Sequence, residues 1–240
     1  QMANALEDNI NQLEDEIQAR EDFVAAFAHE LKTPLTSIIG YADALRSRRL
    51  DEEKQFMSAN YIYTEGKRLE AMSFRLLDIM VTRRGEVEFT MVSAESLFLY
   101  LYDMYVINKS MKIYFNYDDG MVRAEANLIK SVLMNLLDNA FKASEADGLI
   151  EVYGHLMKDG YCFEVKDHGV GIPKEELHKI TKAFYMVDKS RSRSRNGAGL
   201  GLALCAEILE LHKSRLNIRS ELGKGTTMSF TLPLWKEDQL

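Results

Sequence analysis

The sequence has few cysteines, no long apolar run and no excess of positive charge, and each of these absences argues against a class of protein. Cys162 and Cys205 form no CxxC pair, so two reduced and buried thiols are expected rather than a zinc site or a disulfide framework. No apolar stretch approaches the roughly 18 residues that a membrane span requires. With 30 basic and 37 acidic residues the formal charge is −7, which argues against a nucleic-acid partner.

What is present is an ordinary globular composition, in which 46% of the residues are hydrophobic and 28% are charged. The 240 residues are enough for one large domain or two modest ones. Two changes of pattern along the chain predict three segments. Their expected ranges are 1–22, 23–84 and 85–240.

Residues 1–47 are expected to form one long helix. Its N-terminal part carries a narrow heptad stripe, flanked by charged and amide side chains, which favours a coiled coil with another helix over a solvated helix with fortuitous spacing. The stripe consists of Leu6, Ile10, Leu13, Ile17 and Val24.

The apolar face widens after Phe23, and a second helical pattern runs from about 51 to 81. Two long helices with a short connection predict a helical hairpin. Two such hairpins form a four-helix bundle, so a homodimer is expected.

Beyond Gly85 the pattern changes to a mixture of strands and helices. This mixture predicts an α/β sandwich as the second part of the fold. Strands are expected at 87–92, 112–117, 149–155, 161–165, 215–220 and 226–232, and helices at 94–107, 125–143 and 198–212.

His29 is the first candidate for chemistry. The heptad pattern places it at an outward position, Glu30 beside it can accept a proton from the imidazole, and Thr33 lies one turn away on the same face. Pro34 stands in the helix interior, where it removes a hydrogen bond. A lone exposed histidine is usually an ordinary surface residue, but a proline beside an exposed His–Glu pair indicates a shaped site.

A second pattern lies on the helix expected at 125–143, where Asn135, Asn139 and Lys142 share one face. Amide oxygens can bind Mg²⁺ without adding negative charge beside a triphosphate, and lysine supplies a compact cation. Taken alone, the two asparagines are equally compatible with an ordinary solvated helix.

A third pattern, Asp167, Gly169 and Gly171, follows an expected strand. Glycines let the backbone approach a ligand closely, and an aspartate there can accept a hydrogen bond from an exocyclic amine such as that of adenine. A polar turn is the alternative interpretation.

A fourth pattern, Gly197, Gly199 and Gly201, opens a helix, as in sites that bind phosphate through backbone N–H groups. The basic run at 189–195 precedes it. In an acidic protein this run fits a lid over phosphates better than a nucleic-acid tail.

Together and in this order, the four patterns resemble the motifs of the histidine-kinase family. The resemblance covers most of the chain and includes two further segments. The matching segments are 29–35 (phosphoacceptor motif), 135–142 (asparagine motif), 167–172 and 197–201 (glycine motifs), 184–189 (phenylalanine motif) and 223–227 (final Gly-Thr turn).

The resemblance implies a coiled-coil signal helix at 1–22, a dimerisation and phosphoacceptor domain at 23–84, and an ATP-binding domain of the gyrase, chaperone and histidine-kinase type at 85–240. It implies Mg-ATP as the cofactor, phosphorylation of His29, and transfer to an aspartate in the receiver domain of a response regulator. A cytoplasmic position without membrane contact is implied, with a membrane-anchored sensor segment before Gln1.

By the same resemblance, Asn139 is the principal Mg²⁺ ligand with Asn135 nearby, Lys142 contacts phosphate, and Asp167 reads the adenine amino group with Gly171 close to it. Glu30 would handle the imidazole proton. Thr33 would position water when the regulator is dephosphorylated, and Gly197, Gly199 and Gly201 would line the lid.

Two positions depart from the family pattern. Ala143 stands where an aromatic side chain is common near the nucleotide, and Met186 stands where arginine is frequent. Two rival functions remain: a dimeric scaffold that binds nucleotide without phosphorylating, and an ATPase of the chaperone or topoisomerase kind.

Overall fold

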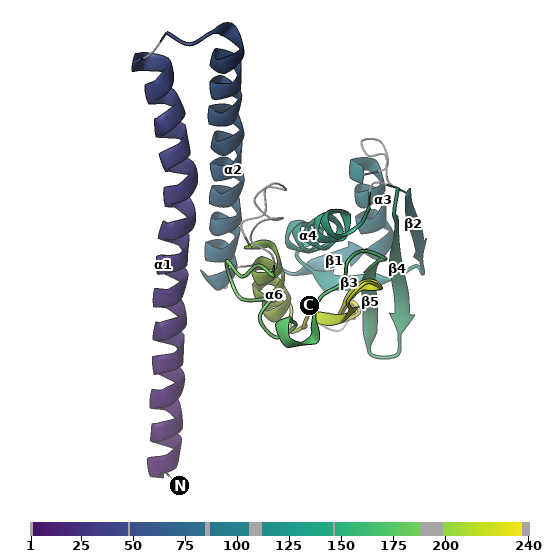
Figure 1. The fold of residues 1–240 in the computed structure, drawn as a ribbon. Coiled ribbons are helices and arrows are strands. Elements are labelled where there is room, and N and C mark those ends of the chain that lie inside the picture. The colour runs from purple at the N-terminus through teal and green to yellow at the C-terminus, as the bar shows by residue number, and fades with distance from the viewer. Residues whose placement is uncertain are drawn as a thin grey trace. The chain divides into compact units, whose positions relative to one another are not determined.

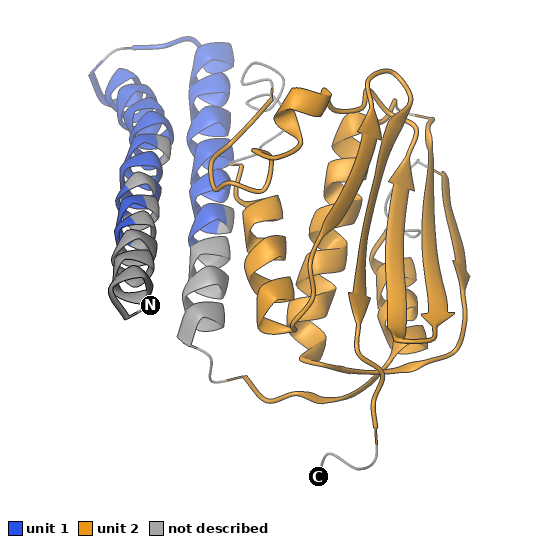
Figure 2. Ribbon diagram, turned by 90° about the horizontal axis from the view of Figure 1, so that it is seen from below, with its two compact units in different colours: residues 1–74 blue, residues 75–240 orange. Residues whose placement is uncertain are grey.

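The computed structural model describes residues 2–47, 49–84, 87–105, 112–145, 147–187 and 199–236. For 2–13, 15–16, 19–20, 22, 30, 71 and 74–84 the description covers the backbone alone. The chain divides into two compact units, Gln1–Phe74 and Arg75–Leu240, which are described separately below (Figure 2). The domain boundaries expected from the sequence stay predictions.

The first unit is a helical hairpin. Helix α1 (Met2–Ser47) runs antiparallel to helix α2 (Glu52–Arg84), whose residues up to Phe74 belong to this unit (Figures 1 and 2). Asp51 caps α2, because its Oδ1 accepts a hydrogen bond from the Lys54 N–H at 2.8 Å. Both expected helices are confirmed, and α2 continues past the expected end at Val81.

Apolar side chains of this hairpin remain exposed in the single chain. A pair of helices can cover only one face of each, so the other faces need a further partner. Of the predicted coiled-coil stripe, Leu6, Ile10 and Leu13 lie outside the described side chains, whereas Ile17 and Val24 are exposed. The exposed set also includes Leu35, Ile39, Phe56, Met57, Tyr61 and Tyr63.

The second unit is an α/β sandwich, as expected. A five-stranded sheet has the order β2-β4-β5-β7-β6; β2 and β4 are parallel and the other pairs are antiparallel. Strands β1 and β3 form a small second sheet. The strands are β1 (Thr90–Ser93), β2 (Lys112–Tyr117), β3 (Met121–Ala124), β4 (Leu149–Met157), β5 (Gly160–Asp167), β6 (Asn217–Glu221) and β7 (Gly225–Leu232).

Three helices cover one face of the five-stranded sheet (Figure 2). They are α3 (Ala94–Tyr105), α4 (Ala126–Ala143) and α6 (Gly201–Leu211), and a 3₁₀ turn (Lys174–Glu176) lies between β5 and α6. Along β5 and β7 buried side chains alternate with half-buried ones, which is the pattern of a sheet with one covered face. The core therefore lies between sheet and helices, with Phe163 and Phe230 stacked at 5.1 Å.

Several expected boundaries were wrong. The strand expected at 87–92 is only Thr90–Ser93, and its partner Met121–Ala124 was not predicted, because four residues are too few to display alternation. The last helix begins at Gly201 rather than at Ala198, and residues 188–198 lie outside the described part of the chain. Cys205 is buried but Cys162 is only half-buried, since it alternates onto the uncovered side of β5.

Among the described residues, no helix has the length and apolar character needed to cross a membrane.

Candidate functional site

The hairpin presents the first candidate group. The side chains of His29 and Thr33 are exposed on α1, one helical turn apart, and Pro34 is buried inside the same helix. The Thr36 hydroxyl donates to the Lys32 carbonyl at 2.7 Å. The side chain of Glu30 lies outside the described residues. An imidazole exposed on the surface of a helix can be reached by more than one reactant.

The second unit contains a cavity of about 620 Å³. It lies between α4, the loop after β5, the segment before α6 and the start of β7. This volume suits a nucleotide-sized ligand, since ligand cavities are typically about 300–1,000 Å³. Most residues selected from the sequence line it: Asn135, Asn139, Lys142, Asp167, Gly171, Gly199 and Gly201.

Helix α4 supplies the polar wall of this cavity. Its N-terminus is capped by Glu125, whose carboxylate accepts from the Leu128 N–H at 2.5 Å. Its opposite face is buried in the core, which fixes the rotation of the helix and turns the polar residues toward the cavity. The buried face consists of Ile129, Val132, Leu133, Leu136, Leu137 and Ala140.

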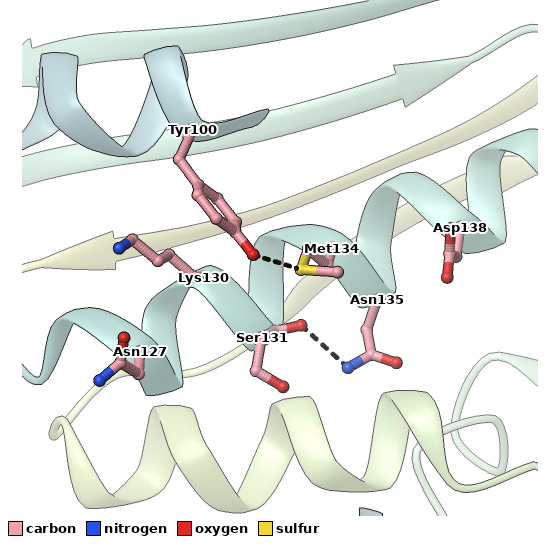
Figure 3. A pocket seen from close by; sticks show the side chains of 7 residues that line it. All are labelled: Tyr100, Asn127, Lys130, Ser131, Met134, Asn135 and Asp138. Carbon is pink, nitrogen blue, oxygen red and sulfur yellow. Dashed lines mark hydrogen bonds between the residues drawn. The ribbon is translucent and has the colours of Figure 1, made fainter. Parts of the chain in front are cut away.

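The Asn135 side chain has a fixed orientation. Its Nδ2 donates to the Ser131 carbonyl at 2.9 Å (Figure 3), so its Oδ1 is the atom left to face a ligand. That oxygen lies only 2.8 Å from the place that a Cβ on Gly201 would occupy. A side chain at position 201 would therefore push Asn135 out of place, which explains a glycine at the start of α6.

Asn139 has an unmet hydrogen-bonding group. Its Nδ2 is buried and has no partner among the described residues, and the side chain lines the cavity. Buried amides normally find a partner, so an orphaned one beside a cavity indicates a ligand. With Asn135 it forms a neutral oxygen donor set of the kind that suits Mg²⁺ held mainly by phosphates.

Asp167 lies at the end of β5 and is 6% exposed. Its Oδ1 accepts hydrogen bonds from the N–H groups of Gly169 at 2.8 Å and Thr226 at 3.2 Å. Burial raises the pKa of this carboxyl, and the two N–H bonds offset only part of that rise. Because Oδ1 is occupied by backbone donors, Oδ2 is the oxygen available to a ligand in the cavity.

A hydroxyl network connects to Asp167 through Thr226, whose N–H donates to that carboxylate. The Ser220 hydroxyl bonds to Thr226 Oγ1 at 2.8 Å and to the Gly225 carbonyl at 3.0 Å, and it accepts from the Ile172 N–H at 2.8 Å. It ties the loop after β5 to the β6–β7 turn. Sequence reasoning noticed the Gly-Thr turn but missed Ser220, which no motif marks.

The loop after β5 needs its glycines for close approach. A Cβ on Gly169 would lie 2.3 Å from the Ala143 carbonyl oxygen, and Gly171 has φ +68° with the Glu221 carbonyl 2.1 Å from its missing Cβ. Gly169 does not line the cavity, unlike the prediction for a cofactor-binding residue. It instead lets the loop pack on the end of α4.

The segment before α6 forms the remaining wall. The Phe184 N–H donates to the Gly199 carbonyl at 2.9 Å, and Tyr185, Met186 and Val187 line the cavity. Ala143 and Met186, the two departures from the family pattern, both line it. The predictions for Gly197 and the basic run lie outside the described residues.

A smaller cavity of about 280 Å³ adjoins the first, and Asn135 and Asp138 line both. Figure 3 shows it between Tyr100 and the outer face of α4. The buried Tyr105 hydroxyl donates to Asp138 Oδ1 at 2.9 Å, and burial raises the pKa of Tyr105, so it stays a donor. No sequence signal pointed to this support of α4.

Comparisons with known proteins agree with this geometry. Residues 124–236 match the family model described as histidine kinase-, DNA gyrase B- and HSP90-like ATPase, and residues 19–80 match the His Kinase A (phospho-acceptor) domain. The sensor histidine kinases YclK and WalK of Bacillus subtilis are 29% and 31% identical to the chain, over 99% and 92% of it. The chain covers only 52% and 38% of those relatives, and so spans about half of their length or less.

Solved structures are similar to the chain in fold. The histidine kinase ThkA in complex with the response regulator protein TrrA is 24% identical with a TM-score of 0.72, over 95% of this chain and 67% of that one. The Acinetobacter baumannii histidine kinase AdeS is 18% identical with a TM-score of 0.64, over 87% of this chain and 98% of that one. With both domain types matched in the order that the motifs predict, the chain belongs to the sensor histidine kinases of two-component systems.

Proposed function

We propose that this chain is the catalytic portion of a sensor histidine kinase, which binds ATP in the second unit and uses it to phosphorylate His29. One observation carries the proposal: Asn135, Asn139, Lys142 and Asp167, chosen from separate sequence motifs, line a single cavity of nucleotide size. The match to the ATPase family model over residues 124–236 supports ATP as its ligand.

In this proposal Asp167 recognises adenine. Its Oδ1 is held by two backbone N–H groups, and its Oδ2 accepts a hydrogen bond from the exocyclic amine. The apolar lining residues Val170, Ile172 and Leu222 would enclose the base. The small side chain of Ala143 leaves part of the wall without the aromatic surface common in the family.

At the other end of the cavity, Asn139 and Asn135 would hold Mg²⁺, and Lys142 would face phosphate. When bound, the ion neutralises charge on the phosphate oxygens, as in other phosphoryl transfers. Gly199 and Gly201 bring backbone close to this end, and Gly197 is proposed to join them in the lid.

His29 is the proposed nucleophile. An imidazole nitrogen attacks the γ-phosphorus, so that an N–P bond forms, the bond to the bridging oxygen breaks and ADP leaves. Glu30 would hold or accept the imidazole proton. The phosphoryl group then passes to an aspartate of a response regulator. Thr33 is proposed to position the water that later hydrolyses the phosphoryl group from that aspartate. The solved complex of ThkA with its response regulator TrrA supports this partner.

A homodimer is proposed for the hairpin unit. The apolar side chains exposed on α1 and α2 and the match to the phosphoacceptor domain family support it. The site of action is proposed to be the cytoplasm, where ATP is available. A membrane-anchored sensor segment is proposed for the rest of the protein.

Labelling with γ-labelled ATP and Mg²⁺ separates this function from its rivals. We expect acid-labile, alkali-stable label on the protein that disappears in His29→Gln and persists in His155→Gln, a matched change at an exposed histidine of the sheet. Nucleotide binding without label would support a scaffold. ATP turnover that His29→Gln leaves intact would support an ATPase.

A further inference from the structure

The turn of α1 that carries His29 contains a gap in its helical hydrogen bonds. Pro34 lies inside α1 and has no N–H, so the carbonyl of Glu30, four residues earlier, lacks its usual helical donor. Pro34 is buried, and residues four apart share one face of a helix, so this carbonyl opens toward a buried face. Buried carbonyls are rarely left unpaired, so a donor from another element is expected.

The packing of the hairpin identifies the part of α2 that lies at this level. The rings of Tyr41 and Tyr61 stack at 4.7 Å, and the two helices run antiparallel (Figure 1). Because both helices rise equally per residue, Pro34, seven residues before Tyr41, faces Arg68, seven residues after Tyr61. A second estimate starts from the ends of the helices at the connection, where Ser47 ends α1 and Glu52 begins α2. Sixteen residues along each helix from these ends, Arg68 lies opposite Leu31. Both estimates place Arg68 within about one helical turn of the open carbonyl along the helix axis.

Arg68 is held at this place by charge. Its side chain is 10% exposed, and its Nη1 lies 3.7 Å from Oε2 of Glu65 on the same helix. This distance is too long for a hydrogen bond, and the Glu65 oxygen is buried with no hydrogen-bond partner among the described residues. The carboxylate therefore fixes the guanidinium by attraction, and the guanidinium directs its N–H groups to other acceptors.

We propose that Arg68 is a positioning residue for His29: its guanidinium donates to the Glu30 carbonyl oxygen and closes the gap that Pro34 leaves. Arginine suits this role because it stays charged when buried and carries five N–H donors in a rigid fork. The bond holds the turn of α1 on which His29 is presented. The inference rests on the proposed function, since the position of His29 matters only if it receives the phosphoryl group.

A double-mutant cycle tests this bond. Pro34→Ala returns an N–H to the helix, so the Glu30 carbonyl no longer needs Arg68. At saturating ATP, we expect Arg68→Met to slow His29 phosphorylation about tenfold when Pro34 is present and less than about twofold in the Pro34→Ala protein. The KM for ATP should not change, because the nucleotide cavity is lined by other residues. Equal losses in the two backgrounds would overturn the proposal.

Two single variants sharpen the cycle. Arg68→Lys keeps a charged donor and should recover most of the rate. Arg46→Met removes an arginine of the same hairpin whose side chain is 83% exposed, and it should leave the rate unchanged. If Arg46→Met slowed His29 phosphorylation as much as Arg68→Met does, the effect would come only from removing a positive charge from the hairpin. That result would overturn the assignment.

Thermal unfolding of the same variants gives a readout that needs no activity. Arg68→Met should lower the Tm by about 4 °C with Pro34 present and by clearly less in the Pro34→Ala protein. Wild-type protein that takes up no label would refute the proposed function, and the coupling in Tm would still decide the role of Arg68. If Glu30→Gln but not Pro34→Ala removed the effect of Arg68→Met on the Tm, the partner of Arg68 would be the Glu30 carboxylate. That result would overturn the proposal.

Discussion

The two units differ in how they bury their apolar side chains. Among the described side chains, every buried apolar residue except Pro34 and Met72 belongs to the second unit, whereas the hairpin leaves residues such as Ile39, Phe56 and Tyr63 exposed. A sheet covered by helices encloses its own core, but two helices cannot. The second unit should therefore be stable by itself, and the stability of the hairpin should depend on protein concentration.

The largest effect is expected from a matched pair of phenylalanine changes. Phe163 is fully buried and stacks on Phe98 at 5.8 Å, so Phe163→Ala should destabilise the second unit by about 3–5 kcal/mol. Phe56 is 74% exposed, so Phe56→Ala should leave that unfolding transition in place and weaken only self-association. Urea unfolding and sedimentation at several concentrations measure the two effects. A concentration-independent loss of similar size in Phe56→Ala would refute the distinction.

Asp167→Asn should separate ligand binding from stability. The new NH₂ group cannot accept from the adenine amine, so ATP affinity should fall about 30-fold, the equivalent of a charge-assisted hydrogen bond of roughly 2 kcal/mol. Burial raises the pKa of Asp167, so its charge costs stability at pH values above that pKa. The asparagine removes this cost, and the Tm should not fall.

Calorimetric titration with ATP and thermal melts check this pair of outcomes. In the wild type, acidification through the raised pKa protonates Asp167 and should weaken binding, while the asparagine variant should lack this pH dependence. Asp159→Asn, at an exposed carboxylate of the β4–β5 turn, is the control. Equal ATP affinity in wild type and Asp167→Asn would remove Asp167 from the adenine site.

One substitution should have opposite signs in the two units. Gly171→Ala forces a Cβ to 2.1 Å from the Glu221 carbonyl at φ +68°, so it should cost about 1–3 kcal/mol and weaken ATP binding. Gly40 is exposed in α1 with nothing near its missing Cβ, so Gly40→Ala should stabilise the helix by about 1 kcal/mol. Thermal melts decide the signs. Destabilisation by both changes would show that position 40 is packed against another surface.

The smallest effect concerns the uncovered face of the sheet, away from the nucleotide cavity. Glu151 bonds to Lys166 and His168, each at 2.8 Å, and to the Tyr153 hydroxyl, and these donors lower the pKa of Glu151 to about 2. A lowered pKa adds stability above the ordinary value of 4.5, and this stability is lost as the pH falls toward 2.

Glu151→Gln should therefore cost about 1 kcal/mol at pH 7 and progressively less on acidification. Urea unfolding of wild type and variant at pH 7 and at an acidic pH measures this change in the free energy of unfolding. Glu164→Gln, at a half-buried carboxylate on the neighbouring strand β5, is the matched control. A cost that stays constant from pH 7 to acid would contradict the ionic origin.

The long periodic elements of the fold were predictable. The helix at 125–143 and the hairpin helices have apolar faces that repeat over many residues, so local sequence determines them. Strand β3 was missed because long-range contacts hold it. Its Arg123 N–H donates to the Pro233 carbonyl at 3.0 Å, and Val122 bridges to Leu234. No pattern within four residues can display such partners.

In the candidate site too, local sequence features were predictable and long-range contacts were not. Motif spacing and residue type selected Asn135, Asn139 and Asp167 from the sequence, and the structure places all three around one cavity. The supports of these residues were not predictable. Ser220 bonds to Thr226 and to the Ile172 N–H beside Asp167, and Tyr105 donates to Asp138. Most of these partners are distant in the chain, so no local pattern marks them.

The sequence by itself determined the order of the segments, the helices with clear periodicity and the residue types that can meet a nucleotide, because these depend on neighbours within a few turns. Only the tertiary structure decided how the amide of Asn135 is aimed, which oxygen of Asp167 faces the cavity and that Tyr41 stacks on Tyr61 across the hairpin. Those facts depend on atoms that folding brings together from distant positions, and no local pattern encodes their geometry.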